Sequence, residues 1–480
     1  MRWSDGHFIS AYTHSQIIYK IVYRLCFHPL SKYPGPWLAA ITNWYAAFYV
    51  WRGDSHLVIR DGHRQYGDIV RFGPDSISVI THTGMAAIYS TTANVRKDDG
   101  YLVMSASLHA PNTISSIDKK SHAFKKRILA QVFTNSALRG VEDRILLHTK
   151  KFCDMLLVVG LSRLVSSFQS DEILQCFVQS KLWRYKLDRI FFASLLSPIK
   201  TFGAWIRQQA KARTKLGNNI SQKDCFHHML NAKDPKTGQP FTERELWTES
   251  LQLIVAGSDT IAVAMSAAIF HLVHNQEALS KLTEEVRSCF AEEDDIRMGT
   301  QLNSCTFLRA CITETLRLSP PFADMPTRRV LPGGINVDGH HLPEGTVVGT
   351  PIYAIHHDRR YYPRPFKFEP ERWLETGCNE SPERQRELKL AQVAFCPFSI
   401  GPRTCVAKNM AWVELSLIIA RTVFRYDMRL PGDHLSLNPV CCADRKGFVE
   451  RSPEYQLKAW IASGREGPSI QFRPREKSVY

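Results

Sequence analysis

The chain of 480 residues is 44% hydrophobic, which allows a large buried core and excludes a small binding module. Lysine and arginine exceed aspartate and glutamate by 61 to 46, and the net charge of +15 suits an anionic membrane surface, an acidic protein partner or general solubility. No basic run interleaved with aromatic residues accompanies this charge, so we expect no nucleic acid as a partner. The 12 cysteines lack a CxxC spacing and favour neither a disulfide framework nor a zinc site.

The N-terminal segment, residues 1–32, contains a short apolar stretch over residues 17–27, which Lys20 and Arg24 interrupt. A transmembrane helix needs about 20 apolar residues, so this stretch predicts no full membrane span. It also lacks the small-residue cleavage site of a signal peptide. We therefore expect a peripheral, amphipathic membrane contact.

The folded domain, residues 33–480, is predicted to begin at Tyr33-Pro-Gly-Pro36, because proline disfavours helix at its own position and at the residue before it. Strands are predicted near both ends of this domain. Residues 68–80 alternate apolar and polar side chains around Gly73-Pro74, which is typical of a hairpin, and residues 335–355 repeat the pattern.

A long central helix is predicted over residues 251–273, which are apolar enough to be mistaken for a transmembrane helix. Asp259 lies in the middle of the stretch, where a charge would be costly in lipid. Helical segments follow at residues 277–290 and 307–318. The fold class is therefore mainly α with small β-sheets (α+β), with this helix buried at its centre.

The central helix carries the motif Ala256-Gly-Ser-Asp259-Thr260. A flexible glycine, an acid and an alcohol together can open a helical groove in which water relays protons. In the alternative interpretation, the hydroxyl of Thr260 bonds back to its own helix and Asp259 is a satisfied buried ion.

Two charged motifs predict a buried network. Glu314 and Arg317 stand at i and i+3 on one helix face, a spacing that alone indicates only a surface ion pair. Arg372 follows later in the chain beside Trp373, and a second arginine can complete a Glu–Arg–Arg scaffold.

Near the C-terminus, the sequence Phe398-Ser-Ile-Gly-Pro-Arg403-Thr-Cys405-Val-Ala407 precedes a segment of helical pattern. A cysteine at a helix N-terminus meets free N–H groups and the positive end of the helix dipole, both of which favour the thiolate. Arg403, two residues before the sulfur, can reach an anionic group on a flat cofactor. The alternative is a structural cysteine.

These motifs, in this order and spacing, resemble the cytochrome P450 superfamily from Tyr33 to nearly the C-terminus. Residues 27–45 resemble the fungal members that tailor secondary metabolites. The resemblance implies the P450 fold, with the long helix over a haem, and it implies Cys405 as the axial thiolate on iron. Phe398 would pack against the haem and the sulfur, and Arg403 would bind a propionate.

The resemblance also assigns roles to residues outside the cysteine motif. It matches Asp259 and Thr260 to the family's acid–alcohol pair. It further matches the family's buried core network to Glu314, Arg317 and Arg372. Three more contacts to the haem propionates are matched to Arg328, His122 and Lys126. For His122 and Lys126 the alternative is a solvated basic face, and Ala407 stands where the family usually has glycine.

The implied activity is insertion of one oxygen atom from O₂ into an apolar small molecule. The chain has no G-x-G-x-x-G fingerprint, so electrons are expected from a separate NADPH-dependent flavoprotein reductase. This implies a place on the cytosolic face of the endoplasmic reticulum membrane. A basic face over residues 125–127 would suit the reductase.

Two alternatives stay open at this point. A haem-thiolate isomerase or dehydratase would keep Cys405 but would be expected to lose Asp259 and Thr260. An inactive relic is the other alternative, because the interval between Cys153 and Ala256 is shorter than the family normally has, as if part of the helical middle were missing.

Overall fold

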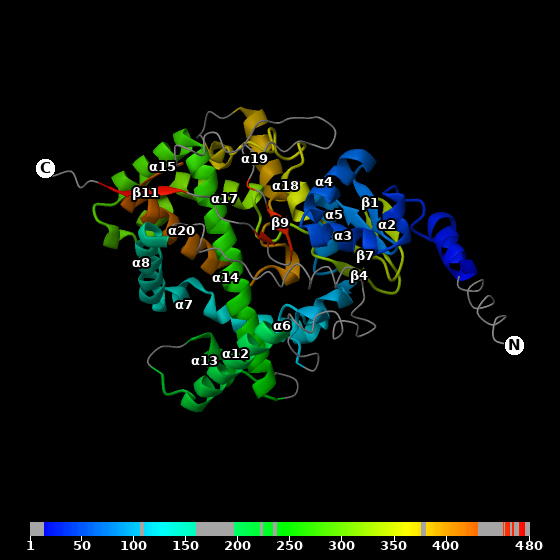
Figure 1. The fold of residues 1–480 in the computed structure, drawn as a ribbon, viewed down its shortest axis with the longest axis horizontal. Helices are drawn as coiled ribbons and strands as arrows, with labels where there is room; N and C mark the ends of the chain where they lie inside the picture. Colours follow the sequence, from blue (N-terminus) through cyan, green and yellow to red (C-terminus); the bar gives the residue numbers. More distant parts are fainter. Residues whose placement is uncertain are drawn as a thin grey trace.

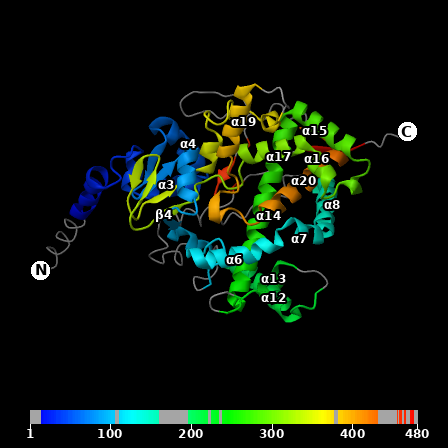
Figure 2. The same cartoon turned by 180° about the vertical axis from the view of Figure 1, so that it is seen from behind.

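The computed structural model describes residues 14–105, 110–159, 196–220, 224–233, 238–375, 381–430, 455, 457–460, 463–464 and 470–475. A β-rich lobe, to which the N-terminal part of the chain contributes β1 to β3 (residues 69–97) and a later segment contributes β4 and β7 (residues 328–349), lies beside a larger helical lobe (Figure 1). One long helix, α14 (Glu243–His274), runs through the helical lobe (Figures 1 and 2). This arrangement agrees with the predicted mainly α fold with small sheets.

The helices surround α14 on several sides. In chain order the described helices are η1 (Tyr23–Phe27), α2 (Trp37–Ile41), α3 (Trp44–Arg52), α4 (Ser55–Tyr66), α5 (His82–Tyr89), η2 (Asp99–Met104), α6 (Lys119–Val132), α7 (Asn135–Gly140), α8 (Glu142–Val159), α12 (Leu196–Leu216), α13 (Cys225–Asn231), α14, α15 (Gln276–Cys289), η4 (Glu293–Asp295), α16 (Thr300–Ser304), α17 (Thr306–Leu318), α18 (Ile352–His356), η5 (Pro370–Trp373), α19 (Pro382–Ala394), η6 (Gly401–Arg403) and α20 (Lys408–Arg425).

The main sheet has five strands in the order β1-β2-β7-β4-β3, and three two-stranded sheets accompany it. The strands are β1 (Ile69–Gly73), β2 (Ser76–Val79), β3 (Val95–Lys97), β4 (Arg328–Val330), β5 (Ile335–Val337), β6 (His340–Leu342), β7 (Val347–Gly349), β8 (Tyr426–Arg429), β9 (Lys458–Ala459), β10 (Ser463–Gly464) and β11 (Gln471–Pro474). Strands β1 and β2 confirm the first predicted hairpin, and β5 pairs with β6 around Asp338.

The prediction of a second hairpin over residues 335–355 was wrong for the residues after β7. Pro351 ends the extended chain, and residues 352–356 form the helix α18 instead of a strand. Every residue of α18 is buried. A short apolar run that is buried on all sides shows no alternation, so its pattern does not separate helix from strand.

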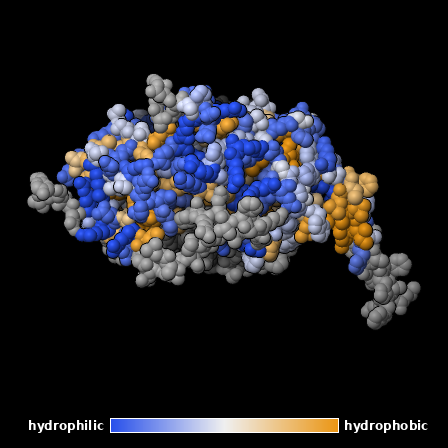
Figure 3. Space-filling view, turned by 90° about the horizontal axis from the view of Figure 1, so that it is seen from above, coloured by the Kyte–Doolittle hydropathy of each residue, from blue (hydrophilic) through white to orange (hydrophobic). Residues whose placement is uncertain are grey.

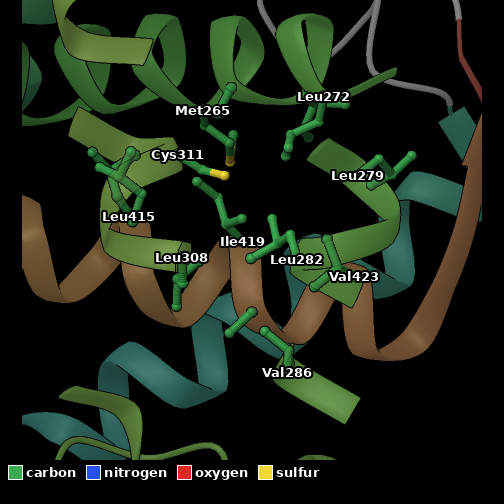
Figure 4. Packing of buried hydrophobic residues seen from close by; sticks show 14 of the residues in the cluster. Met265, Leu272, Leu279, Leu282, Val286, Leu308, Cys311, Leu415, Ile419 and Val423 are labelled. Atoms are coloured by element: carbon green, nitrogen blue, oxygen red, sulfur yellow. The ribbon is translucent and has the colours of Figure 1, made fainter. Parts of the chain in front are cut away.

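The second half of α14 forms the core of the helical lobe. Residues 263–273 are all buried, and they pack against α15, α17 and α20. Met265 and Leu272 of α14 face Leu282 of α15, Cys311 of α17 and Ile419 of α20 in one apolar cluster (Figure 4). The capping box between Thr242 and Glu245 starts the helix by satisfying its first N–H groups.

The first half of α14 differs from the prediction of a helix buried along its length. Ile254 is 45% exposed, and Ser258 one turn later is exposed. At 100° per residue these side chains lie opposite Ala256 and Thr260. Of the described helices, α14 alone is long and apolar enough to cross a membrane, and 44% of its apolar window is buried.

A buried ionic network joins α17 to η5, as predicted. The two carboxylate oxygens of Glu314 accept hydrogen bonds from the guanidinium of Arg317 at 2.8 Å, from Arg372 at 3.0 Å and from the indole of Trp373 at 2.8 Å. The backbone N–H of Glu369 donates to the same carboxylate at 3.1 Å. Burial alone would raise the pKa of Glu314, but the two arginines lower it to about 2.

The low pKa of Glu314 predicts a pH-dependent contribution to stability. The carboxyl has a pKa of about 2 in the fold against 4.5 in a free chain, so its stabilisation is complete above about pH 4.5 and is lost toward pH 2. We expect Glu314→Gln to lower the free energy of unfolding by about 3 kcal/mol at pH 7, measured by urea unfolding. The loss should shrink at pH 3. Exposed Glu383→Gln is the control, and equal losses for Glu314→Gln at both pH values would contradict the ionic account.

Candidate functional site

The loop before α20 presents Cys405 through a tight turn. The N–H of Cys405 donates to the carbonyl oxygen of Phe398 at 2.9 Å, and the hydroxyl of Thr404 donates to the same oxygen at 3.1 Å. Gly401 has a φ of +72°, and a Cβ there would lie 1.9 Å from the carbonyl oxygen of Tyr89. Only glycine fits this position, because the backbone of α5 passes directly over the turn.

The thiol of Cys405 is exposed to solvent, although protein atoms surround it closely. This crowding raises its pKa, while the N–H of Ala407 and the ammonium groups of Lys126 and Lys408 act in the opposite direction. The N–H of Ala407, the N-cap residue of α20, therefore acts in the expected direction, and burial opposes it. Binding to a metal is what displaces such a thiol proton.

The loop is held in place by two of the predicted basic residues. Lys126 of α6 donates from its ammonium group to the carbonyl oxygens of Pro402 and Thr404, both at 2.8 Å. Arg403 reaches away from the loop and donates to the carbonyl oxygen of Ile117 at 2.9 Å. The cysteine loop is thereby attached to the start of α6.

The predicted basic run over residues 125–127 does not form one solvated face. Lys125 is 2% exposed and pairs with Glu245 of α14 at 3.1 Å. His122 is also buried, and Lys126 is half-buried, whereas Arg127 is exposed. The helix α6 turns His122 and Lys126 toward the cysteine loop and leaves Arg127 as the solvent-facing member of that run.

Sequence reasoning missed one buried cation, Lys97. Lys97 lies directly opposite Arg328 in the antiparallel pair of β3 and β4, and both side chains are buried. Like charges directly opposite each other destabilise a sheet. The ammonium of Lys97 donates to the carbonyl oxygen of Ile114 and lies 4.1 Å from the ring centre of Tyr101. A lysine in a short strand gives no signal until the strand pairing is known.

Burial and the neighbouring cations lower the pKa values of three groups here. Burial, Arg328 and Arg403 lower the pKa of Lys97 well below its usual range. Burial and then Arg403 and Lys97 lower the pKa of His122 to about 3, so that its ring is neutral. Burial and Arg328 lower the pKa of Arg403 to about 10. Such a group of buried cations needs an anion nearby, and the two propionates of a haem fit that need.

Asp259 and Thr260 make their described contacts within α14. The hydroxyl of Thr260 donates to the carbonyl oxygen of Ala256 at 2.7 Å, which is the back-bonded state of the alternative interpretation. The hydroxyl of Ser258 lies 3.4 Å from a carboxylate oxygen of Asp259, and burial raises the pKa of that carboxyl. In the part of the chain that the structure describes, the carboxylate of Asp259 thus has one long side-chain contact, to Ser258.

Comparison with known proteins identifies the family. The model of the family Cytochrome P450 matches residues 157–459. The chain is 34% identical to cytochrome P450 monooxygenase AKT7 of Alternaria alternata, over 94% of this chain and 94% of that protein. It is also 34% identical to cytochrome P450 monooxygenase atnE of Emericella nidulans, over 95% of this chain and 94% of that protein.

Solved structures show the same fold. A crystal structure of the cytochrome P450 CYP102L1 superposes with a TM-score of 0.66 at 17% sequence identity, covering 88% of this chain and 98% of that chain. A cyanobacterial cytochrome P450, CYP120A1, with bound retinoic acid gives a TM-score of 0.64 at 18% identity, over 87% and 94% of the two chains.

The alignment to AKT7 also contains gaps in this chain. The alignment to AKT7 runs over 497 positions but uses 94% of the 480 residues, which is about 451. About 46 positions of that alignment therefore have no residue here. The predicted place of the shortening, between Cys153 and Ala256, includes residues 160–195, which lie outside the described residues.

Proposed function

Because this chain belongs to the cytochrome P450 family, we propose that it is a haem-thiolate monooxygenase that inserts one oxygen atom from O₂ into an apolar small molecule. The observation that carries the proposal is the loop of Cys405, which presents an accessible thiol beside a buried group of cations. Similar chains from several fungi bear the name cytochrome P450 monooxygenase. This supports a tailoring step in fungal secondary metabolism.

The residues divide the work of holding the cofactor. The thiolate of Cys405 would hold the iron, and the haem, when bound, would supply the chemistry that activates dioxygen. Arg403, Arg328 and Lys97 neutralise the propionates, while neutral His122 donates a hydrogen bond from its ring N–H. Lys126 fixes the cysteine loop through Pro402 and Thr404, so its role is to position the loop.

The two residues of the acid–alcohol pair move protons to the reacting oxygen. Thr260 gives up its bond to Ala256 when its hydroxyl turns from the helix, and Asp259 then supplies a proton through water. The raised pKa of Asp259 suits this role, because a carboxyl whose pKa is closer to neutral accepts and releases a proton more readily.

A haem-thiolate isomerase or dehydratase is disfavoured because Asp259 and Thr260 are both present. Two observations support the alternative of an inactive relic. About 46 positions of the alignment to AKT7 have no residue in this chain, and Ile254 on α14 is exposed. Exposed apolar area costs about 25 cal/mol per Å². Among the described residues, α14 is nevertheless buried from Val263 to Val273, and the network of Glu314 is formed, so we favour the working enzyme.

The first test concerns haem binding by this chain. Expressed as it stands, the chain should be soluble and haem-loaded, and its reduced CO complex should show the red-shifted Soret band of thiolate ligation. Cys405→Ala should lose that band, because no other thiol occupies the loop. Cys396→Ala, which removes a buried cysteine nearby in sequence, is the matched control and should keep the band. A haem-free wild-type product would support the relic.

The second test concerns the coupling of electron use to product. Thr260→Ala should bind haem and substrate normally, but at least half of the reducing equivalents should go to peroxide, measured as product formed per NADPH consumed. Thr260→Ser should restore most of the coupling because it retains the hydroxyl. Equal coupling in Thr260→Ala and wild type would show that the back-bond to Ala256 is purely structural.

Electrons are proposed to come from an NADPH-dependent flavoprotein reductase on the cytosolic face of the endoplasmic reticulum membrane. Since Lys125 is buried, the basic contribution of α6 to such a contact comes from Lys119, Lys120 and Arg127, which are exposed. Their charge suits an acidic partner surface.

The proposed membrane contact has a definite surface in the N-terminal part. Residues 14–22 form an α-helix that continues into η1, and its apolar side chains stand out on the surface (Figure 3). On α3, Trp44, Phe48 and Trp51 follow at i, i+4 and i+7 and are 55%, 48% and 58% exposed. Trp37 on α2 is 68% exposed. Exposed tryptophans of this kind favour the membrane interface.

The third test measures that contact. In a flotation assay, the wild-type chain should rise with vesicles of phosphatidylcholine and phosphatidylserine. Carbonate or high salt should release most of the bound chain. The variant with Trp44→Gln, Phe48→Gln and Trp51→Gln should bind at least tenfold more weakly. Trp205→Gln is the matched control, because Trp205 on α12 is 51% exposed but far from this surface in the chain. Release by detergent alone would contradict a peripheral contact.

A further inference from the structure

Two cysteines outside the proposed active site lie against each other. Cys289 is the last residue of α15, and Cys305 is the N-cap residue of α17. The connection between these helices folds back, so that the thiols of Cys289 and Cys305 are in side-chain contact. Neither cysteine belongs to the cysteine loop or to the group of buried cations.

The surrounding contacts hold this pair in a fixed frame. The side-chain amide of Gln301 donates to the carbonyl oxygen of Cys289, and the backbone carbonyl of Gln301 accepts the thiol of Cys305 at 3.6 Å. Glu285, one turn before Cys289, accepts the N–H groups of Phe307 and Leu308, both at 2.8 Å. The end of α15 and the start of α17 therefore cannot separate without breaking several hydrogen bonds.

The two thiols differ in their access to solvent. Cys289 is half-buried, so a small oxidant can reach it, whereas Cys305 is 1% exposed. Burial and contact with Cys289 raise the pKa of Cys305 to about 12, so this thiol stays protonated. An oxidant therefore reacts first with Cys289, and the buried Cys305 can then react with the oxidised Cys289.

We propose that Cys289 and Cys305 form a reversible disulfide that a peroxide closes and a small thiol reopens. The thiol of Cys289 loses its proton, and the thiolate attacks one peroxide oxygen, which breaks the O–O bond and gives a sulfenic acid and hydroxide. The hydroxide takes up the proton that Cys289 lost and becomes water. The sulfur of Cys305 then displaces the hydroxyl group from Cys289, its proton leaving with that hydroxyl as a second water. Two thiols are oxidised by two electrons, and one hydrogen peroxide is reduced to two waters.

The bond would join two helices of the main core directly. The helix α17 also carries Glu314 and Arg317, so the disulfide would attach its N-cap residue to α15 at one end while the ionic network holds the other end. A cross-link of this kind restricts the unfolded chain more than the folded one. The oxidised protein should therefore resist unfolding better than the reduced protein.

The experiment uses the haem-loaded full chain treated with hydrogen peroxide, followed by alkylation and trypsin digestion without reductant. Cleavage after Arg287, Arg297 and Arg309 separates residues 288–297 from residues 298–309, so each cysteine lies in its own peptide. We expect mass spectrometry to find these two peptides joined, and dithiothreitol to release them. The midpoint temperature of unfolding should rise by a few degrees on oxidation.

Matched variants separate this pair from general thiol oxidation. Cys305→Ser should fold, because serine is a preferred N-cap residue, and should leave Cys289 as a sulfenic acid that dimedone labels. Cys289→Ser should abolish both the cross-link and the rise in midpoint temperature. Cys311→Ser, on the same helix and 2% exposed, should retain both. Peroxide that leaves both peptides unlinked, or that links Cys289 to another cysteine, would overturn the proposal.

Discussion

The buried carboxylate of Glu314 is the point on which the helical lobe and the cysteine loop both depend. An isolated ion at this depth would cost several kcal/mol, and it persists because five donors from α17, η5 and the segment before η5 surround it. The same arginine, Arg317, also donates to the carbonyl oxygens of His356 and Pro365. Arg317 thereby connects α17 to α18 and to the segment around Pro365, which precede Cys405 in the sequence.

A second constraint acts at the start of α6. Here Arg328 and Arg403 lie close enough to Lys97 to lower its pKa, and Arg328 also lowers the pKa of Arg403. The first network contains its own counter-charge, whereas this one suits an anionic ligand. The ring of His122 is neutral over the ordinary pH range because its pKa is about 3, so it adds no charge to this group. Stability and cofactor affinity are thus assigned to different groups of charges.

The sequence alone predicts the parts of the molecule that depend on local motifs. The central helix, the first hairpin, the Glu314 network and the loop of Cys405 all follow from residue type and spacing. Features that depend on strand pairing cannot be predicted in this way. The place of Lys97 in the group of buried cations follows only from its pairing with Arg328. The burial of Lys125 likewise depends on Glu245, which lies 120 residues later in the chain.

Gly401 shows how closely the two lobes are matched. Its backbone passes so near the carbonyl oxygen of Tyr89 that no side chain fits between them, and the hydroxyl of Tyr89 bonds to Pro326 and Thr350. A shift of α5 by a fraction of an ångström would press on the cysteine turn. Mutations in these two segments should therefore show epistasis: a change tolerated in α5 of one family member would be harmful here unless the turn changed with it.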